Sequence, residues 1–133
     1  MSFATQAKKI ISVCRGAKDG YLVYRFGSPG KIELQFPARL DASSWKQFNF
    51  EGRRRGGGKA NAGFFDYTLS FSNGGARYDI YQLEYSEEGT YGIGANITAG
   101  GKTVSLKGIK KSQQGSLIDL DETVDKLPNA TDG

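Results

Sequence analysis

The 133-residue chain has no histidine, one cysteine and only 3 prolines. The lack of histidine excludes a His-containing zinc site, a Ser-His-Asp triad and a Cys-His dyad, since each of them needs an imidazole. A single cysteine, Cys14, excludes a disulfide within the chain. Long apolar runs are also missing, and none approaches the ~20 residues that a transmembrane helix needs. We therefore predict no enzymatic activity, no cofactor, no metal site and no membrane span.

Glycine and aromatic residues are abundant instead, with 19 glycines, 7 tyrosines and 8 phenylalanines. Such a composition is typical of short strands joined by tight turns. In three places, apolar and polar residues alternate on either side of a glycine-rich turn, as the two faces of half-buried strands require. These patterns predict hairpins over residues 21–36, 65–81 and 90–107, and residues 5–14 are predicted to form the first strand.

Turn signals that recur about every 8–12 residues are typical of an antiparallel meander that closes into a barrel or folds into a sandwich. We therefore predict an all-β domain over residues 1–115, a small antiparallel β-barrel or sandwich of seven to eight strands. Gly92 and Gly94 favour the barrel, because glycines at alternate positions permit a strand to coil sharply. Cys14 follows the β-branched Val13 in the first strand, so we predict a buried, unpaired thiol.

Charge divides the chain into a basic and an acidic part. Residues 1–111 carry 17 Lys or Arg against 9 Asp or Glu, whereas residues 112–133 carry 1 against 5. The basic part attracts anionic partners such as nucleic acid, an anionic glycan or an acidic protein, and charge alone selects none of them. Residues 116–133 form either a short packed helix or an acidic tail. Their apolar residues at helical spacing are Leu117, Leu120, Val124 and Leu127.

The most conspicuous feature is the run Arg53-Arg54-Arg55 among glycines. Residues 52–63 have no large apolar side chain, and we therefore expect an exposed loop there. Guanidinium groups on such a loop can bind carboxylates or phosphates as planar, bidentate donors. The GxxxxGK[ST] spacing of a P-loop is absent. A solvated loop that only keeps the protein in solution is the alternative, and we choose contact with an acidic partner.

Two other sets of residues can carry a function. Aromatic residues can stack on nucleic-acid bases, but alternation assigns most of them to one buried face of each strand, where a small β-fold needs them as core. The carboxylates Asp66 with Asp79, or Glu84 with Glu87 and Glu88, are candidate glycosidase pairs. No sequence spacing predicts the ~5–9.5 Å separation that such a pair requires. A hydrolase is therefore the least favoured hypothesis.

Residues 8–82 resemble a family of small, mostly uncharacterised exported proteins of Gram-negative bacteria. The resemblance rests on Ser12-Val13-Cys14, on Tyr24-Arg25-Phe26-Gly27, on Lys31-Ile32-Glu33-Leu34, and on Leu69-Ser70-Phe71 followed by Asn73-Gly74-Gly75 and Tyr78. Ser2-Phe3-Ala4 is similar to the end of a signal peptide that has been removed. The resemblance implies export, with the periplasm as the destination.

The stretch Gly74-Gly75-Ala76-Arg77-Tyr78 resembles the one with which periplasmic inhibitors of C-type lysozymes enter the enzyme's cleft. The paired cysteines and the later Trp-x-Lys-Gly element of that family are missing here. The likeness implies a non-catalytic inhibitor or immunity protein that blocks a peptidoglycan-targeting enzyme or toxin, and a basic loop fits an acidic cleft. The alternative hypothesis is a module that binds an anionic glycan or nucleic acid. The predicted partner-binding residues are Arg53, Arg54, Arg55, Lys59, Arg77 and Tyr78.

Overall fold

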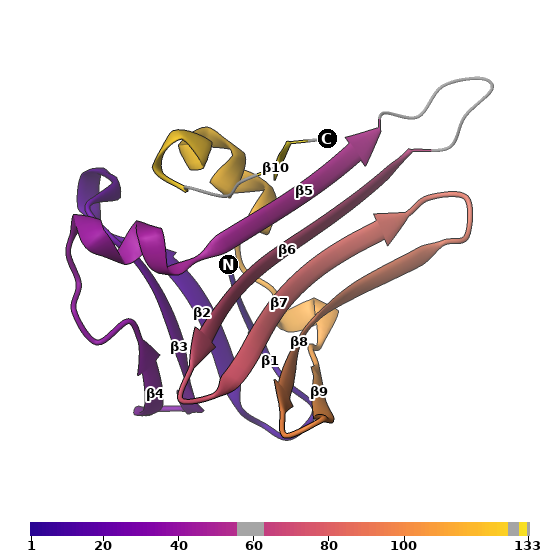
Figure 1. Cartoon of the computed structure of the whole chain (residues 1–133). Coiled ribbons are helices and arrows are strands. Elements are labelled where there is room, and N and C mark those ends of the chain that lie inside the picture. Colours follow the sequence, from indigo (N-terminus) through magenta and orange to yellow (C-terminus); the bar gives the residue numbers. More distant parts are fainter. Residues whose placement is uncertain (56–62, 128–130, 133) are drawn as a thin grey trace.

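The computed structural model describes residues 1–55, 63–127 and 131–132, which form two β-sheets (Figure 1). One sheet has the strand order β1-β2-β3-β4, and the other has the order β10-β5-β6-β7-β8-β9. The strands are β1 (Ser2–Ala4), β2 (Ile10–Arg15), β3 (Leu22–Ser28), β4 (Lys31–Phe36), β5 (Asn49–Arg55), β6 (Phe64–Asn73), β7 (Ala76–Tyr85), β8 (Thr90–Ala99), β9 (Lys102–Lys107) and β10 (Thr131–Asp132). Short 3-10 helices join them: η1 (Ala17–Asp19), η2 (Ala42–Gln47), η3 (Lys110–Ser112) and η4 (Leu117–Lys126).

The all-β prediction is confirmed, and the two separate sheets match the sandwich alternative. Each pair of neighbouring strands is antiparallel except β10 and β5, which run parallel. The predicted seven to eight strands become ten with the short β1 and β10. Isolated bridges from Ser2 to Gln114 and from Thr5 to Gly108 tie the edge of the first sheet to the segment after β9. In the described part of the chain, no helix is long and apolar enough to span a membrane.

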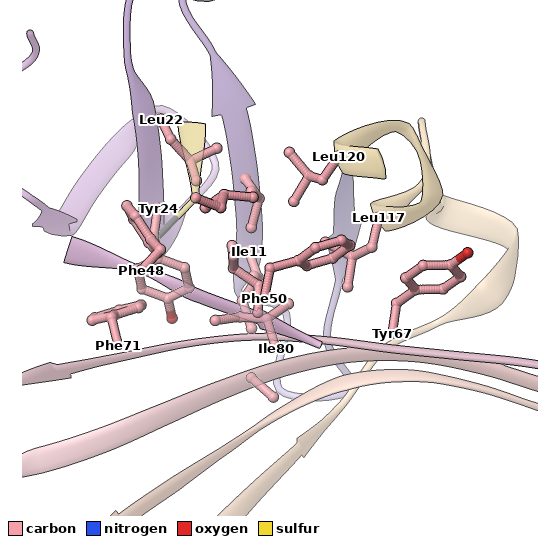
Figure 2. Packing of buried hydrophobic residues seen from close by; sticks show 14 of the residues in the cluster. Ile11, Leu22, Tyr24, Phe48, Phe50, Tyr67, Phe71, Ile80, Leu117 and Leu120 are labelled. Carbon is pink, nitrogen blue, oxygen red and sulfur yellow. The ribbon is translucent and has the colours of Figure 1, made fainter. Parts of the chain in front are cut away.

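The hydrophobic core lies between the two sheets (Figure 2). Alternate residues of β5, β6 and β7 point inward, because successive side chains of a strand face opposite sides of the sheet. The fully buried aromatic residues, as alternation predicts for most of the aromatic residues, include Tyr24, Phe48, Phe50, Tyr67 and Phe71. Tyr81 and Tyr85 alternate with the buried Ile80 and Gln82, so they lie on the outer face of the six-stranded sheet instead.

Two of the predicted hairpin turns depend on glycines with positive φ. Gly74 and Gly75 join β6 to β7 with φ of 59° and 81°, and Gly100 and Gly101 join β8 to β9 with φ of 57° and 76°. Residues with a side chain rarely adopt this conformation, which explains why glycine pairs mark both turns. Gly94 has another role, since a Cβ there would lie 2.6 Å from the Leu106 carbonyl oxygen. This glycine permits a close approach within the sheet rather than barrel closure.

The acidic C-terminal segment packs on the same core. Leu117, Leu120 and Leu127 are buried among the strands' side chains, and 117–126 form the helix η4. The side chain of Gln82 on β7 accepts hydrogen bonds from the Leu117 backbone N–H (2.8 Å) and from the Ser116 hydroxyl (2.9 Å). Of the two predicted forms of this segment, the short packed helix is therefore the one found over residues 117–126. Residues 128–130 and 133 lie outside the described residues.

Two further predictions from the sequence, on Cys14 and on residues 52–55, are wrong. Cys14 is exposed rather than buried, because Val13 takes the inward position on β2 and the next side chain must point outward. Residues 52–55 are the end of strand β5 rather than part of a loop. Gly52 is buried there because the ring of Tyr67 covers it, and a Cβ would lie 2.5 Å from that ring. The middle of the expected loop, residues 56–62, lies outside the described residues.

Candidate functional site

The residues predicted to bind a partner fall at two opposite ends of the six-stranded sheet. Arg53, Arg54 and Arg55 end β5, and Arg53 is in register with Asp66 of β6 and thus with Leu83 of β7. Arg77 and Tyr78 lie at the start of β7. Arg77 is six residues from Leu83, which corresponds to about 20 Å along the strand. The sequence-predicted set is therefore two sites rather than one. Lys59 lies outside the described residues.

The arginine end extends past the four-stranded sheet, where β5 and β6 run on together (Figure 1). Arg53 donates to Asp66, with 3.2 Å between Nη2 and Oδ2. The guanidinium of Arg55 lies 5.3 Å from the centre of the Phe64 ring. Arg54 faces the opposite side, is exposed, and has no ion pair or hydrogen bond with the described residues. Of the three, Arg54 is the guanidinium left available to a partner.

A surface hollow of about 470 Å³ lies beside Arg54. Its apolar lining comes from Phe64 and Phe65 at the start of β6 and from Ile118 of η4. Among the described residues, its charged lining is Arg54 and Arg55 with one carboxylate, Glu84. The hollow therefore combines apolar walls with an excess of positive charge, a combination that suits an acidic group carried on an apolar or extended backbone.

The outer face of the arginine end carries a row of paired side chains. Phe64 and Tyr85 occupy directly opposed positions, with ring centres 5.7 Å apart and planes inclined by 12°. Tyr85 donates its hydroxyl to Asp66 (3.1 Å), and this hydrogen bond is the main cause of the raised pKa of Tyr85. Tyr85 covers one face of the Phe64 ring and Arg55 lies over it as well. These rings are therefore poorly placed to stack on nucleic-acid bases.

At the other end, Arg77 and Tyr78 point to opposite faces of the sheet. Arg77 donates to Asp79 on the outer face, at 3.0 Å from Nε to Oδ1. Tyr78 points inward and stacks on Phe71, with ring centres 4.7 Å apart and planes inclined by 5°. Arg77 is exposed, like the turn glycines Gly74 and Gly75, whereas Tyr78 is half-buried. This end therefore does not present Arg77 and Tyr78 together on one projecting loop.

A second hollow, of about 330 Å³, opens between the two sheets at the Tyr78 end. Tyr24, Phe26 and Leu34 of the first sheet and Tyr78 and Ile97 of the second line it. Lys9 and Glu33 complete the lining and form an ion pair, with 2.7 Å between Nζ and Oε2. Sequence reasoning missed this site, because its residues come from strands distant in the chain and no local pattern brings them together.

Tyr24 is the most buried residue of the second hollow. Its hydroxyl has no hydrogen-bond partner among the described residues, although the side chain is 0% exposed. Burial, with a smaller contribution from the nearby phenol of Tyr78, raises the pKa of Tyr24. Tyr24 therefore stays a neutral hydrogen-bond donor across the ordinary pH range. A buried polar group without a partner costs free energy, so its retention calls for an explanation.

Asp66 and Asp79, the first candidate glycosidase pair, are not brought together. Asp66 and Asp79 share the outer face, but Asp79 is in register with Ser70, four residues along β6 from Asp66. That offset corresponds to about 13 Å along the strand, which exceeds the separation expected of glycosidase carboxylates. Each of the two carboxylates also binds an arginine.

Comparisons with models of protein families, with curated proteins and with solved structures found no match. The resemblances to exported proteins and to lysozyme inhibitors therefore stay predictions.

The buried phenol of Tyr24 predicts a loss of stability at alkaline pH. The unfolded chain loses this proton near the ordinary pKa of 10.0, whereas the native state keeps it. The free energy of unfolding should therefore fall as the pH rises above about 10, by up to ~1.4 kcal/mol per pH unit for this group. Urea unfolding at pH 9 and pH 11 measures the effect. Tyr24→Phe should lose about 1 kcal/mol less than the wild type over this interval, and equal losses would contradict the assignment.

Proposed function

We propose that this protein is a non-catalytic periplasmic inhibitor or immunity protein that binds a peptidoglycan-targeting enzyme or toxin. The arginine end of β5 and β6 enters the partner's acidic cleft. The observation that carries the proposal is Arg54, which is exposed and unpaired among the described residues and stands beside an apolar hollow at the extended end of the sheet. Narrow, extended pairs of strands suit insertion into a cleft, because their backbone is already ordered before binding.

The two arginines on either side of Arg54 are held by neighbouring side chains. Asp66 holds Arg53, and the Phe64 ring lies against Arg55, so these two guanidiniums are fixed on the outer face. Preorganised charged groups lose less conformational entropy when a partner binds. Arg54 then supplies the new charge pair, and a carboxylate can meet it in a bidentate geometry.

Acidic residues on the adjacent turn set the direction from which a partner can approach. Glu87 and Glu88 are exposed on the turn between β7 and β8, next to the β5–β6 end in the sheet. An acidic wall facing this turn would be repelled. The partner's carboxylates must therefore face β5 and β6, and its wall opposite the Glu87 turn must be neutral or basic.

The alternative function is a module that binds an anionic glycan or nucleic acid through the same arginines. The observation that favours it is the cluster of three arginines in a protein with a formal net charge of +4. The outer aromatic rings argue against base stacking, since Phe64 is packed against Tyr85. Binding to a polyanion would show a steep loss of affinity with salt.

Inhibition of peptidoglycan cleavage tests the proposed function, with Arg54→Ala compared against the wild type. We expect the wild-type protein to slow the clearing of a peptidoglycan suspension by a C-type lysozyme or by a lytic transglycosylase. Loss of the Arg54 partner from a buried charge pair should weaken inhibition by ~2–5 kcal/mol, which is about 30-fold or more. The stability of the variant should change by less than ~0.5 kcal/mol, because Arg54 is exposed.

Arg53→Ala is the matched control, since Arg53 is already bound to Asp66 and lies on the other face. We expect it to change inhibition by no more than about threefold, as a charge at the rim of an interface does. If neither enzyme is slowed while heparin or single-stranded DNA binds with a steep salt dependence, the protein is the anion-binding module instead. If Arg54→Ala inhibits as well as the wild type, the arginine end is not the binding site.

A further inference from the structure

The hollow between the sheets is built like a small-molecule site and lies far from the arginine end. Its walls are apolar and aromatic, from Phe26 and Leu34 on one sheet and from Tyr78 and Ile97 on the other. Its volume of about 330 Å³ falls at the lower end of the range for ligand pockets, which suggests a ligand about one ring in size.

The one polar group at its buried side has no partner. The Tyr24 hydroxyl makes no hydrogen bond with the described residues. Its ring packs against Phe71 (Figure 2), with 5.0 Å between ring centres, and against Tyr78, with 5.9 Å. The hydroxyl of another buried tyrosine, Tyr67, does have a partner, since it donates to Asp121 at 2.9 Å. A ligand with an oxygen acceptor would give the Tyr24 hydroxyl a hydrogen-bond partner, as Asp121 does for Tyr67.

The charges in the lining neutralise each other. Lys9 Nζ lies 2.7 Å from one oxygen of Glu33 and 3.0 Å from the other, and it also donates to the Ser28 hydroxyl at 3.1 Å. A charged ligand would have to break this ion pair or remain without a counter-charge in an apolar hollow. A neutral ligand meets neither cost.

We propose that this hollow binds a neutral, ring-sized, mainly apolar molecule that carries a carbonyl or ether oxygen, and that the Tyr24 hydroxyl donates a hydrogen bond to that oxygen. The hydroxyl is closed off from solvent, so the ligand must displace part of the wall beside it. The side chain that moves is that of Tyr78, because Tyr78 is half-buried and therefore more exposed than Tyr24. This site is independent of the proposed inhibitor function.

Acetophenone and ethylbenzene are matched probes for the proposal, since they share one ring and differ by a carbonyl oxygen. Titration followed by NMR should shift the methyl signals of Leu34 and Ile97 with both probes. We expect acetophenone to bind the wild type about three- to tenfold more tightly, the gain of one neutral hydrogen bond. In Tyr24→Phe the two affinities should become equal. Benzoate should bind more weakly than acetophenone.

Tyr67→Phe is the control for the loss of a buried phenol elsewhere in the core, and it should leave the preference for acetophenone unchanged. Ile97→Trp fills the hollow and should abolish the binding of both probes while the protein stays folded by circular dichroism. The proposal is overturned if neither probe shifts Leu34 or Ile97. It is also overturned if Tyr24→Phe keeps the preference for acetophenone, or if benzoate binds best.

Discussion

Phe71→Ala should lower the free energy of unfolding by about 3–5 kcal/mol, a large part of the 5–15 kcal/mol that stabilises a typical domain. Phe71 is 2% exposed and contacts aromatic rings from both sheets. It stacks on Phe36 with 4.2 Å between ring centres and on Tyr78 with 4.7 Å, and it also meets Tyr24 and Phe48 at 5.0 Å and 5.5 Å. Removing this ring leaves a cavity and breaks four aromatic pairs at once.

Phe64→Ala is the matched control, because it makes the same change on the same strand but on the outer face. Phe64 is half-buried and packs mainly against Tyr85 and Arg55. Its loss should cost at most about 1.5 kcal/mol, the value of one aromatic pair. Urea unfolding measures both variants, and the slope with denaturant should stay constant. If Phe71→Ala lowered the free energy of unfolding no more than Phe64→Ala does, the sandwich would not depend on the Phe71 cluster.

The hairpins could be predicted from the sequence because their signals are local. The alternation of Ile32 and Leu34 with charged residues gives one strand, and the pair Gly74-Gly75 gives a turn whose φ values only glycine adopts readily. The same alternation also explains why the prediction of a buried Cys14 is wrong. Val13 and Cys14 are neighbours in a strand, and two neighbours cannot both face the core.

The strand character of Arg53, Arg54 and Arg55 could not be read from local sequence. Glycines and charged residues are poor strand formers in isolation. The segment is extended here because each arginine is paired with a residue of β6 and because the Tyr67 ring packs over Gly52. Both causes are contacts between segments, so tertiary structure overrides the local preference.

The two hollows escaped prediction for a related reason. Tyr24 and Tyr78 lie 54 positions apart in the sequence, and only the packing of one sheet on the other brings their rings to 5.9 Å. The sequence places Tyr78 in a stretch predicted to bind a partner, whereas in the structure its ring forms part of the wall of an apolar hollow. Conversely, part of the apolar wall at the arginine end comes from Ile118 of the C-terminal segment, which the sequence left as either a helix or a tail.

Leu117→Ala should lower the free energy of unfolding by about 2–5 kcal/mol, although the residue belongs to the acidic C-terminal part. Leu117 is 1% exposed within the core between the sheets. Its backbone N–H donates to the side chain of Gln82, which is itself buried on β7, and Tyr67 holds the next turn through Asp121. The helix η4 is therefore anchored by apolar contacts and by buried hydrogen bonds, and loss of Leu117 should destabilise the whole domain.

Trp45 fluorescence can show whether η4 unfolds together with the two sheets or is only a loosely attached tail. The single tryptophan lies in η2, is 3% exposed, and donates to the backbone carbonyl of Asp19, so its fluorescence reports on the sandwich rather than on η4. If η4 belongs to the cooperative unit, Leu117→Ala lowers the urea midpoint measured by Trp45 fluorescence. Ile118→Ala, one position along and half-buried at the arginine hollow, should lower that midpoint far less. An unchanged Trp45 midpoint in Leu117→Ala would show that η4 unfolds independently of the two sheets, because the sandwich would then be stable without it.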